Sequence, residues 1–312
     1  MRTTSEPRKI AFLGQQEYYN CLYGDTLDDL YEVRKFQLTW GAPWYHYTDL
    51  VAFQPDIAFF FRPELHPPEL IERINGICVG LSSEPMPYHH QGKLIEHPDT
   101  IARWESISSA RAHYDFIFHF NGVSIPYMRE RGMQVEGEFV FPVDTEMYHP
   151  IPDAEKKWDA IFVGRSTDHR ERLLGPLKRD FRVLHVSHGL IDDELVRFIN
   201  ASHIALNIHV EDYLTWEHRI QNYLACGTLV MSETLTPNDT LIPGQDYVAF
   251  SNPQEFFDKF LYYLRNRREA EMIARNGLEK VRKKLSAKRV FPHFIDHIWT
   301  LAHERNLLQG EY

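Results

Sequence analysis

The sequence predicts an α/β protein made of two similar domains, each with a parallel sheet. Short apolar runs recur along the chain, and longer segments with apolar residues at helical spacing separate them. The length of 312 residues corresponds to about two average domains. A segment rich in proline and charge divides the runs into two series.

The first series predicts the strands of domain 1, residues 1–150. Buried parallel strands are continuous apolar runs because helices cover both faces of the sheet. The runs are Ile10–Leu13, Ile57–Phe61, Ile77–Leu81 and Phe116–Phe120.

The second series predicts domain 2, residues 151–286, after a linker at Pro142 to Trp158. Its runs are Ala160–Val163, Val183–Val186, Ile204–Ile208, Leu229–Met231 and Tyr247–Phe250. From Ser251 to about Leu308 the spacing is helical, and Asn252–Pro253 is a typical helix start.

Composition excludes several classes of protein. With 43% hydrophobic and 25% charged residues, the chain is neither disordered nor a collagen-like or disulfide scaffold. The net charge of −10 disfavours a nucleic-acid partner. No apolar run reaches the roughly 18 to 20 residues of a membrane span, and the start has no signal-peptide core. Three cysteines without CxxC spacing fit a reducing compartment, so we expect a cytoplasmic protein.

A metal site is not expected. The 17 histidines show no HExxH or other ligand spacing, and no DxD-type acid pair follows a predicted strand. Asp192–Asp193 is instead expected to begin a helix, because acidic residues favour the first turn.

Glu211 to Glu233 contains a charged lead-in, an apparent helix that stops at Gly227, and a buried strand. A helix that starts near Thr215–Glu217 would offer free backbone N–H groups to a phosphate, and Arg219 would add charged donors. The alternative is that Glu217, His218 and Arg219 are only the solvated first turn of a helix.

A second candidate phosphate contact follows the predicted strand that ends at Gly164. A glycine at this turn lets a ligand approach the backbone closely. Arg165 and Arg170 come next and are candidates to bind phosphate, whereas Arg172 is expected to face solvent. The alternative is a glycine required only by the conformation of the turn.

Five segments in order resemble one family. They are PVDTEMYHP, DAIFVGRSTDHRERLL, HVSHGLIDDELVRFINASHIALNIHV, HRIQNYLACGTLVMSE and LIPGQDYVAFSNPQEFFDKFLYYLRN. From Pro142 to about Leu285 the chain resembles the C-terminal part of the CgeB/YkvP-type glycosyltransferases, relatives of glycosyltransferase family 4 with the GT-B fold.

The resemblance implies two Rossmann-like domains that face each other across a cleft, with residues 287–312 returning to the first domain. It implies a nucleotide-sugar donor (UDP-, GDP- or dTDP-sugar), no cofactor, no metal, and retention of the anomeric configuration. Gly164, Arg165, Arg170 and Arg219 would meet the diphosphate, His188 and Gly189 the base, and Asn207 the diphosphate or sugar.

The chain departs from the family 4 pattern at one position. Asn222 stands where a glutamate usually lies five residues before the glycine of the ACG segment, and Leu214 replaces the first acid. Asn222 can hydrogen-bond a ribose hydroxyl but offers no carboxylate. Glu217 or Glu211 would then take that role, or the donor is held differently.

The first half is expected to hold the acceptor, which the sequence does not identify: glycan, protein or small molecule. Glu84 follows a predicted strand and His119 lies in another, so either is a candidate base for an acceptor hydroxyl. The alternative for each is a purely structural role. The sequence does not indicate the oligomeric state.

Other functions stay open. A non-catalytic GT-B-like interaction or surface-assembly protein would explain the missing glutamate. A nucleotide-sugar epimerase shares the fold but needs acid and base groups around the sugar. A DNA-modifying sugar transferase is disfavoured by the net charge.

Overall fold

The computed structural model describes residues 8–211, 214–236 and 240–307. Its contacts divide the chain into two compact units. Unit 1 comprises Met1–Tyr19, Asp25–Val140 and Phe291–Tyr312, and unit 2 comprises Asn20–Gly24 and Phe141–Val290. The sequence placed the boundaries of the acceptor and donor domains at residues 150 and 286, and these two boundaries remain predictions.

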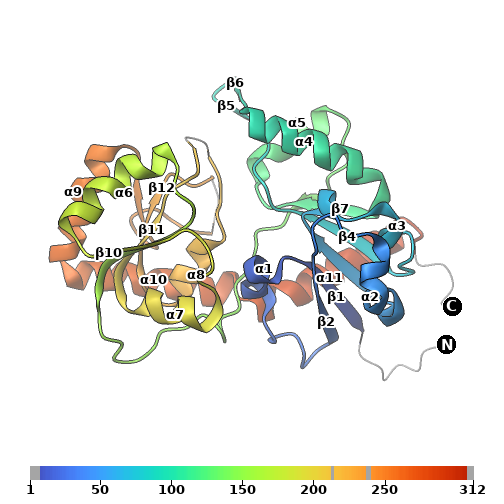
Figure 1. Cartoon of the computed structure of the whole chain (residues 1–312), viewed down its shortest axis with the longest axis horizontal. Helices are drawn as coiled ribbons and strands as arrows, with labels where there is room; N and C mark the ends of the chain where they lie inside the picture. The colour runs from blue at the N-terminus through green and yellow to red at the C-terminus, as the bar shows by residue number, and fades with distance from the viewer. Residues whose placement is uncertain (1–7, 212–213, 237–239, 308–312) are drawn as a thin grey trace. The chain divides into compact units, whose positions relative to one another are not determined.

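Unit 1 is built on a parallel sheet with the order β2-β1-β3-β4-β7-β8 (Figure 1). The strands are β1 (Lys9–Gly14), β2 (Glu32–Gln37), β3 (Ile57–Phe61), β4 (Ile77–Ser82), β7 (Phe116–His119) and β8 (Gly137–Glu138). A small antiparallel hairpin, β5 (Tyr88–His90) and β6 (Lys93–Ile95), follows β4. The helices are α2 (Thr48–Phe53), α3 (Pro68–Ile71), α4 (Pro98–Ala110) and α5 (Ile125–Glu130), with single 3₁₀ turns at Trp44–Tyr47, Pro63–Leu65, Arg111–His113 and Gly122–Ser124. Two more helices belong partly to unit 1: α1 (Gln16–Tyr23) up to Tyr19, and α11 (Ala287–Glu304) from Phe291 onward.

Both faces of this sheet are covered, which explains its continuous apolar runs. On one face, Ala11, Phe60 and Ile117 pack against residues of α2, α3, α4 and α5. On the other face lies α11, which from Phe291 onward belongs to unit 1. The ring of Phe294 stacks on Phe139 at 4.0 Å between centroids, and Phe291 meets Phe12 edge to face at 5.2 Å.

Unit 2 has a parallel sheet with the order β10-β9-β11-β12-β13. Its strands are β9 (Trp158–Val163), β10 (Val183–Val186), β11 (Ser202–Asn207), β12 (Leu229–Glu233) and β13 (Val248–Phe250), and its helices are α6 (Asp168–Asp180), α7 (Asp192–Asn200), α8 (Arg219–Ala225), α9 (Pro253–Arg265) and α10 (Arg267–Lys284). Helices α6 and α9 lie together on one face of the sheet (Figure 1), where Leu174 and Phe256 enter the core.

Side-chain caps begin two of these helices, and the one at Asn252 was expected from the sequence. Thr167 accepts a hydrogen bond from the Arg170 backbone N–H at the start of α6. Asn252 accepts one from Glu255 at the start of α9, where Pro253 fits the first turn.

The segment Pro142 to Trp158, expected as a linker, packs within unit 2 along its first part. Val143 and Tyr148 are buried, and so is the charged Asp144. The Val143 N–H donates to the Leu285 carbonyl at 2.9 Å, and Val143 pairs with Ser286 as an isolated parallel bridge. Unit 2 therefore accepts backbone hydrogen bonds from this part of the segment. The proline-rich and charged composition of the segment does not reveal this packing.

Candidate functional site

The candidate site lies at the carboxyl edge of the unit 2 sheet. The chain passes from β9 to β10 on one side and later returns to β11 on the other, so the switch point of the sheet lies between β9 and β11. In open parallel sheets ligands bind outside the carboxyl ends at this point. Gly164 follows β9, and Asn207 is the last residue of β11.

Gly164 leaves room that a side chain would fill. Its φ is +156°, and a Cβ added there would lie 3.2 Å from Nη1 of Arg170 and 3.3 Å from Nη1 of Arg219. The same Cβ would lie 3.1 Å from the Phe162 ring. Both guanidinium groups therefore approach the backbone only because residue 164 has no side chain.

Arg170 is a buried cation that donates hydrogen bonds to three backbone carbonyls. Its exposed fraction is 1%, and Nε donates to the carbonyls of Ile208 (3.0 Å) and His209 (3.1 Å). Nη1 donates to the carbonyl of Arg165 at 2.9 Å. These carbonyls fix the guanidinium across the ends of β9 and β11.

Glu217 is the carboxylate between the two arginines. It forms an ion pair with Arg219, and its Oε1 lies 3.6 Å from Nη2 of Arg170. Burial alone would raise the pKa of Glu217, but the charges of Arg219 and Arg170 and contact with His209 lower it to about 2. Glu217 is therefore ionised at pH 7 and lies between two guanidinium groups.

Arg219 keeps donor capacity beside Gly164. Its Nη1 is buried and has no hydrogen-bond partner within the described residues. The Phe162 ring lies beneath both arginines, with its centroid 5.0 Å from Cζ of Arg170 and 5.4 Å from Cζ of Arg219. A buried donor without an acceptor is costly, so an anion at this place would stabilise the arrangement.

The helix expected to start near Thr215–Glu217 begins later, at Arg219. Thr215 instead pairs with Leu235 in a parallel bridge, and its carbonyl accepts from Thr236 at 3.3 Å, so the backbone there is extended. Helix α8 has only seven residues. The donors at this site are therefore side chains rather than a helix terminus. His218 precedes α8, and burial and the charge of Arg219 lower its pKa to about 4.

Two asparagines add polar atoms without partners. Asn207 is fully buried and donates from Nδ2 to Ser232 Oγ at 2.9 Å, while its Oδ1 has no partner among the described residues. Asn222 is 4% exposed, and its Oδ1 also lacks a hydrogen-bond partner in the part of the chain that is described. These oxygens suit the hydroxyl donors of a sugar or ribose.

The other predicted donor residues are more peripheral. His188 and Gly189 follow β10 and are exposed, and Gly189 has a φ of +84°. The Arg165 side chain is exposed, and only its carbonyl contacts Arg170. The structure thus brings Gly164, Arg170 and Arg219 together with Glu217.

Sequence reasoning missed two groups at this edge. Glu233, the last residue of β12, accepts from the His209 backbone N–H at 2.6 Å and pairs with His169 Nε2 at 2.7 Å. Phe162 forms the apolar surface under the arginines. The sequence could have indicated Glu233, because an acidic residue at the end of an apolar strand lies at the ligand-binding edge of the sheet.

In unit 1, the two predicted bases lie at strand ends but have internal contacts. Glu84 pairs with Arg62 at 2.9 Å and Arg103 at 3.3 Å. His119 is fully buried, and its Nδ1 lies 2.9 Å from Ser82 Oγ. Burial lowers the pKa of His119 to about 3, so the imidazole is neutral at pH 7.

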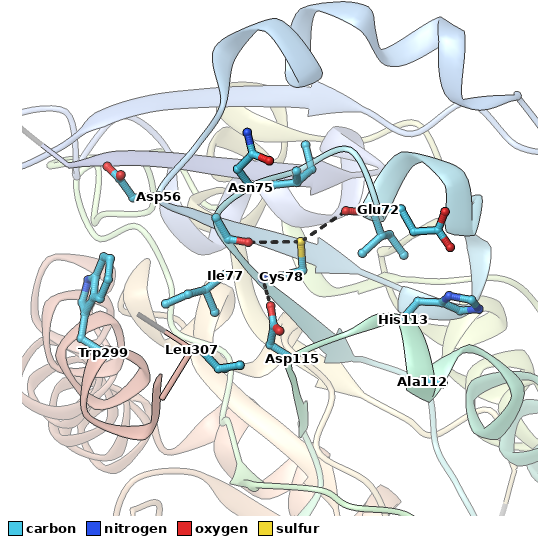
Figure 2. A pocket seen from close by; sticks show the side chains of 13 residues that line it. Asp56, Glu72, Asn75, Ile77, Cys78, Ala112, His113, Asp115, Trp299 and Leu307 are labelled. Atoms are coloured by element: carbon cyan, nitrogen blue, oxygen red, sulfur yellow. Dashed lines mark hydrogen bonds between the residues drawn. The ribbon is translucent and has the colours of Figure 1, made fainter. Parts of the chain in front are cut away.

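A cavity of about 510 Å³ in unit 1 contains none of the predicted site residues. Asp56, Cys78, Asp115 and Trp299 are among its lining, and Asp115 accepts a hydrogen bond from the Cys78 N–H (Figure 2). Asp56 and Asp115 immediately precede β3 and β7, so the cavity lies at the amino ends of the strands. Ligands of parallel sheets bind at the opposite ends.

Two further properties follow from the described residues alone. Among them, no group of three or more His, Cys, Asp or Glu side chains is placed to hold a metal ion. None of their helices combines the length and apolar character of a membrane span.

Comparison with known proteins identifies the fold. Residues 157–296 match the family model described as glycosyl transferase-like. None of the curated proteins matches the sequence significantly.

Several solved structures are similar over nearly the whole chain. Sucrose-phosphate synthase from Thermosynechococcus elongatus is 13% identical, with a TM-score of 0.62, over 94% of this chain and 100% of that one. Anabaena HepE in complex with UDP-glucose is 10% identical, with a TM-score of 0.64, over 94% and 99%. An α-glucosyltransferase in complex with UDP and a 13-mer DNA is 11% identical, with a TM-score of 0.63, over 94% and 99%.

These findings agree with the architecture of both units. The predicted fold class and the predicted enzyme class, a glycosyltransferase, are confirmed. Residues 157–296 match the glycosyl transferase-like family model, and the chain has the fold of the GT-B glycosyltransferases.

Proposed function

We propose that unit 2 binds a nucleoside diphosphate sugar beside Gly164 and that the protein transfers its sugar to an acceptor held by unit 1. The observation that carries this proposal is the pair of the buried Arg170 and the partly buried Arg219, whose guanidinium groups approach a glycine backbone. Glu217 lies between them, and Nη1 of Arg219 has no hydrogen-bond acceptor among the described residues. A diphosphate supplies negatively charged oxygen acceptors for such donors.

The chemistry follows from where charge develops. The bond between the anomeric carbon and the β-phosphate oxygen breaks, and its electron pair stays on the diphosphate. The acceptor hydroxyl oxygen bonds to the anomeric carbon and loses its proton. Fixed guanidinium groups stabilise the departing diphosphate, a role that a metal ion fills in other enzymes. The proposal therefore includes metal-independent transfer, with retention of configuration as the family resemblance implies.

UDP is the proposed nucleotide, because HepE and the α-glucosyltransferase were solved with UDP-glucose and UDP. Asn207 and Asn222 would bind hydroxyls of the sugar or ribose, and His188 with Gly189 would lie beside the base. GDP and dTDP remain the alternatives for the test.

On the acceptor side, His119 and Glu84 stay proposals for the proton acceptor. The Nε2 atom of His119 has no hydrogen-bond partner among the residues described, but burial lowers the pKa of the ring to about 3, so it is a weak base. The Glu84 carboxylate is held by two arginines, which favours positioning of an acceptor over proton transfer.

The CgeB-type relationship and a cytoplasmic location are also part of the proposal. The cysteines Cys21, Cys78 and Cys226 are buried and form no disulfide bond, as expected in a reducing compartment.

The test measures release of UDP, GDP or dTDP from their sugars by wild type, Gly164→Ala and Gly175→Ala, in EDTA. A Cβ at Gly164 meets both arginines, whereas a Cβ at Gly175 in α6 meets nothing within 4 Å. We expect at least a tenfold rise in KM for Gly164→Ala and wild-type values for Gly175→Ala. Equal kinetics of the two variants, or turnover that requires a divalent metal, would contradict the proposal.

A further inference from the structure

The loop between β2 and α2 displays aromatic rings to solvent. Trp40 is 71% exposed and Tyr45 is 60% exposed. Single exposed apolar residues are ordinary, but two large rings in one short loop are not expected without a use.

The backbone that carries these rings is fixed. The Leu38 N–H donates to the Gly14 carbonyl at 2.8 Å, which ties the loop to β1. The buried Tyr47 hydroxyl lies 3.1 Å from both the N–H and the carbonyl of Thr39 and closes the loop. The rings therefore stand on an ordered support, which lowers the entropic cost of binding.

The loop lies at the ligand-binding edge of the unit 1 sheet. It follows the carboxyl end of β2, which runs parallel to β1 with Gln37 opposite Gly14. The carboxyl ends of β4 and β7, with Ser82 and His119, belong to the same edge. In a parallel sheet this edge holds ligands.

The absence of charged residues from the loop limits the kind of partner that it can bind. Between Gln37 and Asp49 the sequence has no aspartate, glutamate, lysine or arginine. Single-stranded nucleic acid needs a positively charged groove beside its stacking rings, and anionic lipid surfaces need basic clusters. The loop therefore fits a neutral partner.

The area of the two rings also limits the partner. Burying a Trp or Tyr side chain covers about 150–250 Å², so exposures of 71% and 60% leave roughly 200–330 Å² in total. A stable protein interface needs about 800 Å² from each partner. The rings are suited to a small ligand with an apolar face.

We propose that Trp40 and Tyr45 are a stacking platform for the sugar rings of a neutral oligosaccharide, which is the acceptor of the transfer reaction. One face of a pyranose is formed by C–H groups that pack on an aromatic ring, while its hydroxyls stay hydrated or bond the Tyr45 hydroxyl. The statement that this oligosaccharide is the acceptor rests on the proposed function. The binding of the oligosaccharide by the two rings does not depend on it.

The test is affinity electrophoresis of the full chain through gels that contain dextran, hydroxyethyl cellulose, glucomannan or the anionic hyaluronan. We expect retardation by at least one neutral polysaccharide and none by hyaluronan. Trp40→Ala and Tyr45→Ala should each raise the dissociation constant at least fivefold, and Trp40→Phe should keep most of the affinity. The matched control is Met272→Ala, a residue 57% exposed on α10 in unit 2.

A thermal-shift titration with UDP on the same proteins separates the two proposals. Retention of the UDP response in the loop variants supports an independent acceptor platform. No retardation by any neutral polysaccharide, or equal retardation of wild type and the double variant, overturns the platform. Binding to vesicles of phosphatidylcholine and phosphatidylglycerol that is lost in the double variant overturns it in favour of lipid. Polysaccharide binding through Trp40 without a UDP response would contradict the proposed function and leave the platform standing.

Discussion

At the scale of single residues, the proposed function depends on two arginines that flank one carboxylate. Glu217 pairs with both Arg170 and Arg219, so one carboxylate serves two cations. Burying a charge is unfavourable unless it is paired. An anionic ligand that accepts hydrogen bonds from these guanidinium groups would therefore bind favourably. The solvated helix face that was the alternative for Glu217, His218 and Arg219 does not describe them, because the side chains of Arg219 and Glu217 are only 17% and 18% exposed.

Arg219→Ala is expected to weaken nucleotide binding. A charged hydrogen bond contributes about 1.5–3 kcal/mol, which corresponds to a rise of roughly 10- to 150-fold in the dissociation constant of UDP. Arg179→Ala is the control, because that arginine is exposed at the end of α6 and pairs with Asp180. Fluorescence or calorimetric titration of UDP makes the comparison, and equal constants for the two variants would exclude the role of Arg219.

At the scale of elements, α11 completes the core of unit 1 from the far end of the sequence. Phe291 and Phe294 pack on rings of β1, β3, β7 and the segment after β8. Such a helix is part of the fold of the first unit and not an appendage.

Phe291→Ala should lower the free energy of unfolding by about 3–5 kcal/mol, because Phe291 is fully buried and its loss leaves a cavity. Tyr262→Ala on α9 is the control, since Tyr262 is 47% exposed. Chemical denaturation of both variants gives the values. A change below 1 kcal/mol for Phe291→Ala would show that α11 does not pack as described. Deletion of residues 287–312 should impair folding for the same reason.

The sequence predicted the buried strands better than the edge strand and the start of one helix, for physical reasons. The buried runs, such as Ile57–Phe61, are strands because both faces of the sheet are covered. Strand β2, Glu32–Gln37, was missed because an edge strand carries polar and charged residues. The start of α8 was misplaced because Thr215 has a strand-like partner, Leu235, that no local pattern reveals.

The site was predicted in part. Gly164, Arg170, Glu217 and Arg219 were named from local motifs, and the fold brings them together. Their mutual arrangement depends on sheet order, which composition and periodicity do not contain. Phe162 was treated as an ordinary strand residue because an aromatic ring in an apolar run has no distinguishing pattern.

At the scale of the whole molecule, acid should weaken folding well above the pKa range of carboxylates. Burial lowers the pKa of His66 and His218 to about 4 and that of His119 to about 3. The unfolded chain binds these protons near pH 6.5, so the free energy of unfolding is unaffected above that pH and falls below it, until the folded values are reached.

The slope is about 1.4 kcal/mol per pH unit for each such histidine. His119→Gln should therefore lose less stability between pH 7 and pH 5 than wild type, whereas the exposed His90→Gln should behave as wild type. Urea denaturation at the two pH values measures this. Identical losses for wild type and His119→Gln would mean that His119 is protonated in the folded protein.

The central claim is that the carboxyl edge of unit 2 binds a nucleoside diphosphate through arginines and without a metal. The most direct measurement is calorimetric titration of UDP, GDP, dTDP and CMP into the wild-type chain in EDTA. We expect saturable binding of a diphosphate, with UDP the tightest, and no comparable binding of the monophosphate CMP. Absence of binding by every diphosphate, or binding only when a divalent metal is added, would contradict it.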